Sequence, residues 1–202
     1  MKTLILIDVQ NDFMPGGSLA VPQGNEIIPV INAMLPEFDL VVATQDWHPA
    51  THKSFASNHE GREVFETIDL NGLEQKLWPD HCVQNTPGAE FHPDLKSGPI
   101  EAIFRKGMDP EIDSYSGFYD NGHRKTTGLA GYLKEKGAKE LYFCGLAADI
   151  CVYFTLIDAL KDGFKATLIE DASKALDVEG FENLKKTIRE KGAEIITSNE
   201  LQ

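Results

Sequence analysis

The alternation of short apolar runs with glycine-terminated helical segments most limits how this chain folds. Six runs of apolar and β-branched residues occupy positions 3–7, 40–44, 102–104, 141–144, 166–169 and 194–197. Such runs, which are short and mostly apolar throughout, are typical of strands buried on both faces of a parallel sheet. The sequence therefore predicts a mostly parallel six-stranded sheet.

Helical segments separate several of these runs. Residues 128–136, 149–162 and 178–191 have helical periodicity, and they end before Gly137, Gly163 and Gly192. Glycine readily adopts the left-handed backbone conformation that follows the end of many helices. An earlier helix is expected to begin near Asn25. This order of strands and helices predicts an α/β protein with three α/β/α layers.

The chain length is suited to one domain. With 202 residues and 42% hydrophobic content, the chain can bury one sizeable core, so we predict a single domain over residues 1–202. The exception to the regular pattern is the segment at about 46–99, which is rich in His, Pro, Asn and Gly and lacks clean periodicity. Long irregular segments in compact domains are usually functional, so we interpret it as an insertion that carries a site.

Charge and cysteine content exclude several classes of partner. The formal net charge of -13 would repel phosphate backbones and anionic lipids, so we expect neither a nucleic acid nor a membrane partner. Three widely spaced cysteines suit a reducing compartment better than a disulfide framework. The first apolar run is too short for a signal peptide. We therefore expect a cytoplasmic protein, and a homo-oligomer is compatible with this sequence.

Polar side chains follow four of the predicted strands. Asp8 ends the first strand, Asp46 and His48 follow the second, Lys106 follows the third, and Cys151 lies shortly after the fourth. Ligands of open parallel sheets bind beyond the carboxyl ends of the strands. These residues are therefore expected to converge on one site.

Cys151 and Asp8 have properties that suit a nucleophile and its base. Gly145 and the alanines before Cys151 permit a tight turn into a helix, with Asp149 as a candidate N-cap. A thiol in a first helical turn faces backbone N–H groups and the positive end of the helix dipole, which lower its pKa. Burial of Asp8 would raise its pKa and suit it to accept a proton. The ordinary alternatives are a core cysteine, an aspartate in a turn and, for Lys106, a solvated strand end.

Several residues of the irregular segment suit a metal ion. Asp46 and His48 are two residues apart, so in an extended chain both side chains project to one side. His52 and His81 are further candidates, and the ring of His81 can return from the irregular segment to complete the site. Mixed carboxylate and imidazole ligands fit zinc, manganese or iron. The alternative is that these histidines lie in surface loops.

Three aromatic residues are candidates for binding a flat ring. Phe13, Trp78 and Tyr115 lie beside the proposed chemistry in the sequence and outside any periodic core face. Aromatic side chains can clamp a flat ring between them. Filling of the core is the alternative for each of them.

Six sequence motifs together resemble a known family. They are DVQNDFMPGGSL from Asp8, TQDWHPATHKSFA from Thr44, WPDHCVQNTPGAEFHP from Trp78, RKGMDP from Arg105, YSGF from Tyr115 and GLAADICV from Gly145. Together, and in this order, they closely resemble the motifs of the nicotinamidase/pyrazinamidase group of the isochorismatase-like hydrolases. The resemblance extends from Leu4 to about Ile196.

The resemblance implies hydrolysis of nicotinamide to nicotinate and ammonia in NAD salvage, with pyrazinamide as a second aryl amide substrate. It implies that Asp8 is the proton acceptor, Lys106 the cation and Cys151 the nucleophile that forms a thioester. Backbone N–H groups of Ala147 and Cys151 would stabilise the oxyanions. The peptide bond between Leu146 and Ala147 is expected to be cis.

The resemblance also implies one divalent metal ion, for which zinc is favoured over manganese and iron. Its implied ligands are Asp46, His48 and His81, whereas His52 is a ligand in some relatives and only nearby in others. In this family the ion binds the ring nitrogen and positions the substrate. The residues expected to contact the substrate are Phe13, Trp78, Tyr115 and Ala147.

Three alternatives remain open from the sequence. In the first, hydroxide bound to the metal attacks the amide directly, and alkylation of the thiol would then leave activity intact. In the second, the chain is a non-catalytic metal-binding domain on the same fold, inert toward small amides. The third is a nucleotide-binding protein, but the chain lacks GxGxxG after its first strand and has no P-loop.

Overall fold

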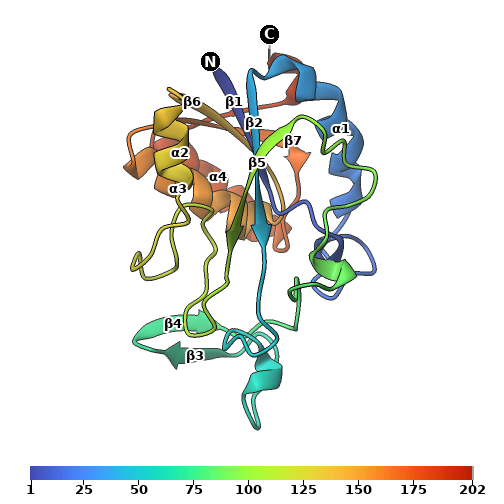
Figure 1. Ribbon diagram of the computed structural model, residues 1–202, viewed down its shortest axis with the longest axis vertical. Coiled ribbons are helices and arrows are strands. Elements are labelled where there is room, and N and C mark those ends of the chain that lie inside the picture. The colour runs from blue at the N-terminus through green and yellow to red at the C-terminus, as the bar shows by residue number, and fades with distance from the viewer. Residues whose placement is uncertain (202) are drawn as a thin grey trace.

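A six-stranded sheet forms the centre of the computed structural model, which describes residues 1–201 (Figure 1). The strand order is β5-β2-β1-β6-β7-β8, and all neighbouring strands are parallel. These strands are β1 (Lys2–Ile7), β2 (Leu40–Asp46), β5 (Ile100–Lys106), β6 (Glu140–Gly145), β7 (Lys165–Ser173) and β8 (Glu194–Ile196). Each predicted run overlaps one strand, so the predicted parallel sheet is confirmed.

Helices cover both faces of the sheet, because alternate residues of the strands point to opposite sides. In β1, Leu4 and Leu6 join one apolar cluster, whereas Ile5 and Ile7 join another. The first cluster includes buried residues of α1 (Ile27–Met34). The second includes buried residues of α2 (Leu129–Glu135), α3 (Tyr153–Lys161) and α4 (Val178–Glu190). Figure 1 shows α1 on one side of the sheet and the other three on the opposite side, which confirms the three layers.

The helix predicted over 149–162 has a different start. It begins with a π-helical turn, Ala148–Val152, and continues as α3. The 3₁₀ helices are Asn11–Phe13, Gly24–Glu26, Leu35–Glu37, Ala56–Asn58, Pro87–Ala89 and Ser198–Glu200. Within residues 1–201, every helix is too short or too polar to traverse a bilayer.

The segment at 46–99 contains a β-hairpin that the sequence analysis missed. Strands β3 (Thr67–Leu70) and β4 (Leu73–Lys76) pair antiparallel and lie below the main sheet in Figure 1. Asn71 and Gly72 connect them with φ angles of 54° and 83°. An Asn-Gly pair with positive φ at both residues matches the tight turn of two-residue hairpins. This dipeptide was the signal from which the hairpin could have been predicted.

Close packing of β1 and β6 brings their carboxyl ends together. Gly145 ends β6 with a φ of 127°, and a Cβ atom there would lie 2.0 Å from the carbonyl oxygen of Ile7. Only glycine fits this contact and this backbone conformation. The chain therefore leaves β6 directly beside Asp8, which follows β1.

Candidate active site

Asp8, Lys106 and Cys151 meet at the carboxyl ends of the central strands, as predicted. The Nζ atom of Lys106 lies 2.9 Å from Oδ2 of Asp8 and 3.5 Å from Sγ of Cys151. The exposed fractions are 0% for Asp8, 2% for Lys106 and 6% for Cys151. A carboxylate, an ammonium and a thiol thus share one site that is almost closed to water.

Burial and neighbouring charges set the ionisation of the two charged groups. Burial raises the pKa of Asp8, and the opposing charge of Lys106 limits this rise. Burial alone would lower the pKa of Lys106, but the carboxylates of Asp46 and Asp8 outweigh it and raise this pKa well above its usual range. Lys106 is therefore a fixed positive charge in the site.

The prediction of a lowered pKa for Cys151 is wrong. Burial raises the pKa of this thiol well above its ordinary value, and nearby Lys106 only partly opposes the rise. The loss of solvation around the sulfur outweighs the local backbone dipoles. Cys151 is therefore a neutral thiol at rest, and it needs a base to become a nucleophile.

Asp149 does not cap the helix that carries Cys151, contrary to prediction. Its carboxylate accepts hydrogen bonds from the backbone N–H groups of Leu176 and Asp177, each at 2.9 Å. It thus joins the turn at Cys151 to the segment after β7. The peptide bond between Leu146 and Ala147 is cis, as the resemblance implied.

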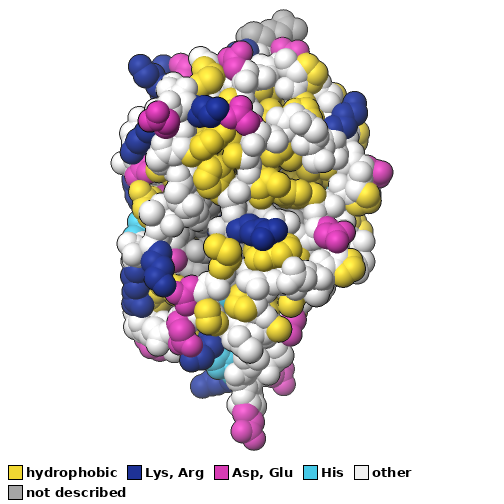
Figure 2. Space-filling model, viewed as in Figure 1, with side chains coloured by type: hydrophobic (Ala, Val, Ile, Leu, Met, Phe, Trp, Pro, Cys, Tyr) yellow, Lys and Arg dark blue, Asp and Glu magenta, His cyan; other side chains and the backbone are white. Residues whose placement is uncertain are grey.

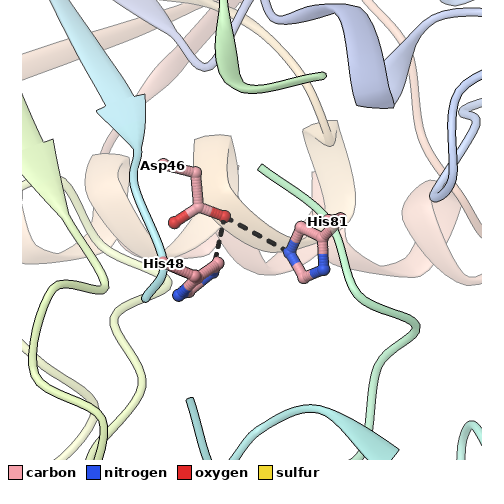
Figure 3. Close-up of side chains that lie close together, drawn as sticks. All are labelled: Asp46, His48 and His81. Carbon is pink, nitrogen blue, oxygen red and sulfur yellow. Dashed lines mark ion pairs between the residues drawn. The ribbon is translucent and has the colours of Figure 1, made fainter. Parts of the chain in front are cut away.

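Asp46, His48 and His81 form a compact cluster of potential ligands (Figure 3). Oδ2 of Asp46 lies 3.1 Å from Nε2 of His48 and 3.4 Å from Nε2 of His81. All three residues are buried, and their ligand atoms lie within 4.8 Å of one another. The structure thus brings together the three residues that were predicted to bind the metal.

The hydrogen bonds of the two imidazoles fit a metal ion. Nδ1 of His48 donates to the carbonyl oxygen of Gly107 at 2.9 Å, and Nδ1 of His81 donates to that of Pro79 at 2.8 Å. In its neutral form each ring therefore directs the lone pair of Nε2 at the carboxylate of Asp46. Lone pairs facing a carboxylate repel it unless a cation lies between them. The donor set is suited to a divalent metal ion, with backbone carbonyls fixing both rings.

Gly107 permits the close approach of His48. Its φ is 68°, and a Cβ atom there would lie 2.4 Å from Cε1 of the His48 ring. The glycine that follows Lys106 therefore supplies both the space and the carbonyl oxygen that orient this imidazole. Sequence analysis quoted this glycine within a motif but gave it no role.

His52 lies beside this cluster with the opposite hydrogen-bond pattern. Its ring centroid is 4.4 Å from that of His48, and it groups with His48 and Asp113 as a second set of candidate ligands. The backbone N–H of Ser54 donates to Nδ1 of His52 at 3.1 Å. A neutral ring that accepts through Nδ1 carries its proton on Nε2. In this tautomer Nε2 is a donor without a lone pair for a metal ion, and it has no hydrogen-bond partner among residues 1–201. Nδ1 also lies 2.8 Å from Oγ of Ser54, and a proton donated there would instead leave the lone pair on Nε2.

A cavity beside these groups is lined by the predicted substrate-binding residues Phe13, Trp78, Tyr115 and Ala147, together with Cys151 and the three candidate metal ligands. The indole N–H of Trp78 donates to the hydroxyl oxygen of Tyr115 at 3.3 Å. Gln75 of β4 donates to the same oxygen at 3.2 Å. The hairpin thus holds one aromatic wall of the cavity.

Four further residues line this cavity that the sequence analysis did not select: Leu19, Asp113, Ile150 and Leu176. Two of them had a signal in the sequence, because Leu19 ends the first motif and Asp113 lies shortly before the YSGF motif. Ile150 precedes the cysteine. Nothing in the sequence near Leu176 indicates its place in the site.

Comparisons with known proteins agree with this geometry. A nicotinamidase of Acinetobacter baylyi is 52% identical over 177 residues, which cover 88% of this chain and 83% of that protein. The structure of an Acinetobacter baumanii nicotinamidase/pyrazinamidase superimposes with a TM-score of 0.96 and 49% identity, covering 100% of this chain and 98% of that one. A pyrazinamidase of Pyrococcus horikoshii in complex with zinc has a TM-score of 0.80 and 40% identity, covering 97% and 98%.

A family model described as the isochorismatase domain matches residues 2–200. This match covers the sheet, the irregular segment and both groups of site residues. The fold and the relatives lead to the same assignment, and the chain belongs to the isochorismatase family.

Proposed function

We propose that this protein is a nicotinamidase that hydrolyses nicotinamide to nicotinate and ammonia, and that it also accepts pyrazinamide. The observation that carries the proposal is the contact of Lys106 with both Asp8 and Cys151, of which Cys151 lines a cavity together with aromatic residues. The relatives described above bear the names of the same activity. Release of nicotinate would place the enzyme in NAD salvage.

The first step is activation of the thiol. Asp8 accepts the proton of Cys151, and the electron pair left on sulfur attacks the carbonyl carbon of the amide. Burial raises the pKa of the Asp8 carboxyl and of the Cys151 thiol. The base and the acid of this proton transfer are therefore shifted in the same direction. Lys106 lies within 3.5 Å of the sulfur and stabilises the negative charge on either partner.

The tetrahedral intermediate places negative charge on the former carbonyl oxygen. The backbone N–H of Ala147 is available to bind it, because no acceptor for this group is found within residues 1–201. The N–H of Cys151 is the second donor that we assign. Removal of one such donor in comparable sites costs about 3 kcal/mol of transition-state stabilisation.

Collapse of this intermediate breaks the carbon–nitrogen bond and leaves a thioester on Cys151. Asp8 returns its proton to the leaving nitrogen, so ammonia departs as a neutral molecule. The same carboxylate then takes a proton from water, which attacks the thioester. The carbon–sulfur bond breaks, Asp8 returns that proton to the sulfur, and the acid is released.

The substrate ring would occupy the space between Phe13 and Trp78. The residues that would hold a metal ion are Asp46, His48 and His81, and we propose zinc, with manganese and iron as alternatives. When bound, the ion supplies a Lewis acid for the ring nitrogen, so it acts as an anchor for the substrate. The buried, preoriented imidazoles support this assignment.

The proposed enzyme has one domain and lies in the cytoplasm. We propose one hydrolase domain over residues 1–202, in which the segment at about 46–99 supplies the metal site. All three cysteines are free and buried, a state that suits the cytoplasm. A homo-oligomer remains compatible with the sequence.

The experiment that tests the function is an ammonia-release assay with nicotinamide. The purified protein should be active, should lose activity after chelation, and should regain it with added zinc. Cys151→Ala should lower turnover by at least about 10³-fold while metal content and circular dichroism stay unchanged. Activity surviving in Cys151→Ala would favour attack by metal-bound hydroxide, and an inert wild-type protein would favour a non-catalytic domain.

A further inference from the structure

The two carboxylate oxygens of Asp8 have different partners. Oδ1 accepts a hydrogen bond from the hydroxyl of Thr44 at 2.6 Å, whereas Oδ2 lies 2.9 Å from Nζ of Lys106. Thr44 and Asp8 are both 0% exposed, so water does not compete for either oxygen. One oxygen of this carboxylate is therefore bound by a hydroxyl, and the other by an ammonium group.

The hydroxyl of Thr44 has one proton, and the short contact to Oδ1 uses it. Thr44 lies in β2, and its backbone is fixed by parallel pairing with Phe104 of β5. A β-branched side chain has few rotamers, which limits rotation of the hydroxyl away from Asp8. Oδ1 is bound in this way, whereas Oδ2 contacts Lys106, whose Nζ also contacts the sulfur of Cys151.

We propose that Thr44 is a positioning residue that holds Asp8 so that Oδ2 receives the proton of Cys151. The S–H bond breaks, an O–H bond forms at Oδ2, and the electron pair stays on sulfur. No oxidant or further reactant is needed. This inference rests on the proposed function, in which Asp8 is the base for Cys151.

Gly117 leaves room for the methyl group of Thr44. A Cβ atom at Gly117 would lie 2.6 Å from Cγ2 of Thr44 and 3.4 Å from Cγ2 of Thr155. The backbone N–H of Gly117 donates to Oγ1 of Thr155 at 2.9 Å, and this hydroxyl donates to the carbonyl oxygen of Cys151 at 2.6 Å. Thr44, which binds Asp8, and Thr155, which binds the backbone of Cys151, therefore both pack beside Gly117.

The test compares Thr44→Val, which keeps the shape of the side chain and removes its hydroxyl, with Thr44→Ser, which keeps the hydroxyl. We expect Thr44→Val to lower kcat by about 10- to 100-fold, the cost of misplacing a reacting group, with KM little changed. Thr44→Ser should recover most of kcat. Alkylation of Cys151 by iodoacetamide should slow in Thr44→Val, because it also requires loss of the thiol proton.

A matched control is Thr3→Val, since Thr3 is a second fully buried threonine in the sheet and lies outside the site. This variant should keep the wild-type kcat and alkylation rate. The decisive comparison repeats Thr44→Val in an Asp8→Asn background, where the second substitution should have no further effect on alkylation. If Thr44→Val does not fold, Thr44→Ala provides the same comparison.

The proposal is overturned if folded Thr44→Val alkylates and turns over as fast as the wild type. It is also overturned if Thr44→Val slows alkylation equally with and without Asp8, since the effect would then not pass through the carboxylate. Failure of the proposed function gives a different result from failure of this inference. In that case nicotinamide releases no ammonia, yet the alkylation rates still report whether Thr44 acts through Asp8.

Discussion

The histidines of this site differ in the hydrogen bond that the Nδ1 atom of each ring makes. His48 and His81 donate through Nδ1 and direct a lone pair inward, whereas His52 accepts through Nδ1. Sequence spacing made all three comparable candidates. The distinction comes from Gly107, Pro79 and the backbone at Ser54, which no spacing rule reports.

This distinction predicts different metal contents for two variants. His81→Ala should lose most of its bound metal, because it removes a lone pair aimed at Asp46. His52→Ala should keep about one ion per chain, because the hydrogen bond from the backbone N–H of Ser54 to Nδ1 favours the proton on Nε2. Elemental analysis of both purified variants checks this. Equal loss of metal in the two would show that His52 is also a ligand.

The shifted pKa values predict the shape of the pH profile. The free enzyme needs ionised Asp8, so kcat/KM should fall as the pH falls through the pKa of this group. Burial raises that pKa, so the acid limb should lie above the ordinary aspartate value of 3.8. No alkaline limb is expected near neutral pH, because the pKa values of Lys106 and Cys151 are raised well above their ordinary values.

The measurement is kcat/KM for nicotinamide against pH, with metal content determined at each pH. This control separates protonation of Asp8 from loss of the ion. An acid limb at or below 3.8, or an alkaline limb close to neutral pH, would contradict the assignment of the buried base.

At the scale of elements, the strands and helices were predictable from the sequence, whereas the short irregular turns were not. The apolar run that became β1 and the glycine after α4 have local signals that burial in a parallel sheet reinforces. The π-helical turn at Cys151 has no such signal. Thr44 was not selected, because a threonine in a buried strand is ordinary for its β-propensity, and its hydroxyl gains a role only through the neighbouring strand.

The hairpin allows a direct test at this scale. Gly72 has a φ of 83°, and a Cβ atom there would meet nothing within 4 Å, so any cost of Gly72→Ala comes from the backbone alone. We expect a loss of about 1 kcal/mol in the free energy of unfolding. Gly98→Ala is the matched control, because Gly98 has equal space and no positive φ. Urea unfolding of both variants gives the comparison. Equal midpoint urea concentrations for the two variants would contradict the positive φ of Gly72.

At the scale of the whole molecule, the metal site connects parts of the chain that the sheet does not join. Asp46 and His48 lie at the end of β2, whereas His81 belongs to the loop after the hairpin. The family resemblance implied this ligand set, since spacing alone does not place His81 near β2. In three dimensions the ion would fasten the irregular segment to the end of the sheet.

This arrangement predicts that metal and stability are linked. An ion that binds only the folded state adds about 2.7 kcal/mol when its free concentration is 100 times its Kd. Thermal unfolding should therefore show a higher Tm with added zinc than after chelation. The gain should vanish in His81→Ala and persist in Cys151→Ala, because the thiol lies outside the ligand set. An equal gain in His81→Ala would mean that zinc stabilises this acidic chain through surface carboxylates, and the Asp46 cluster would then not be the site that fastens the loop.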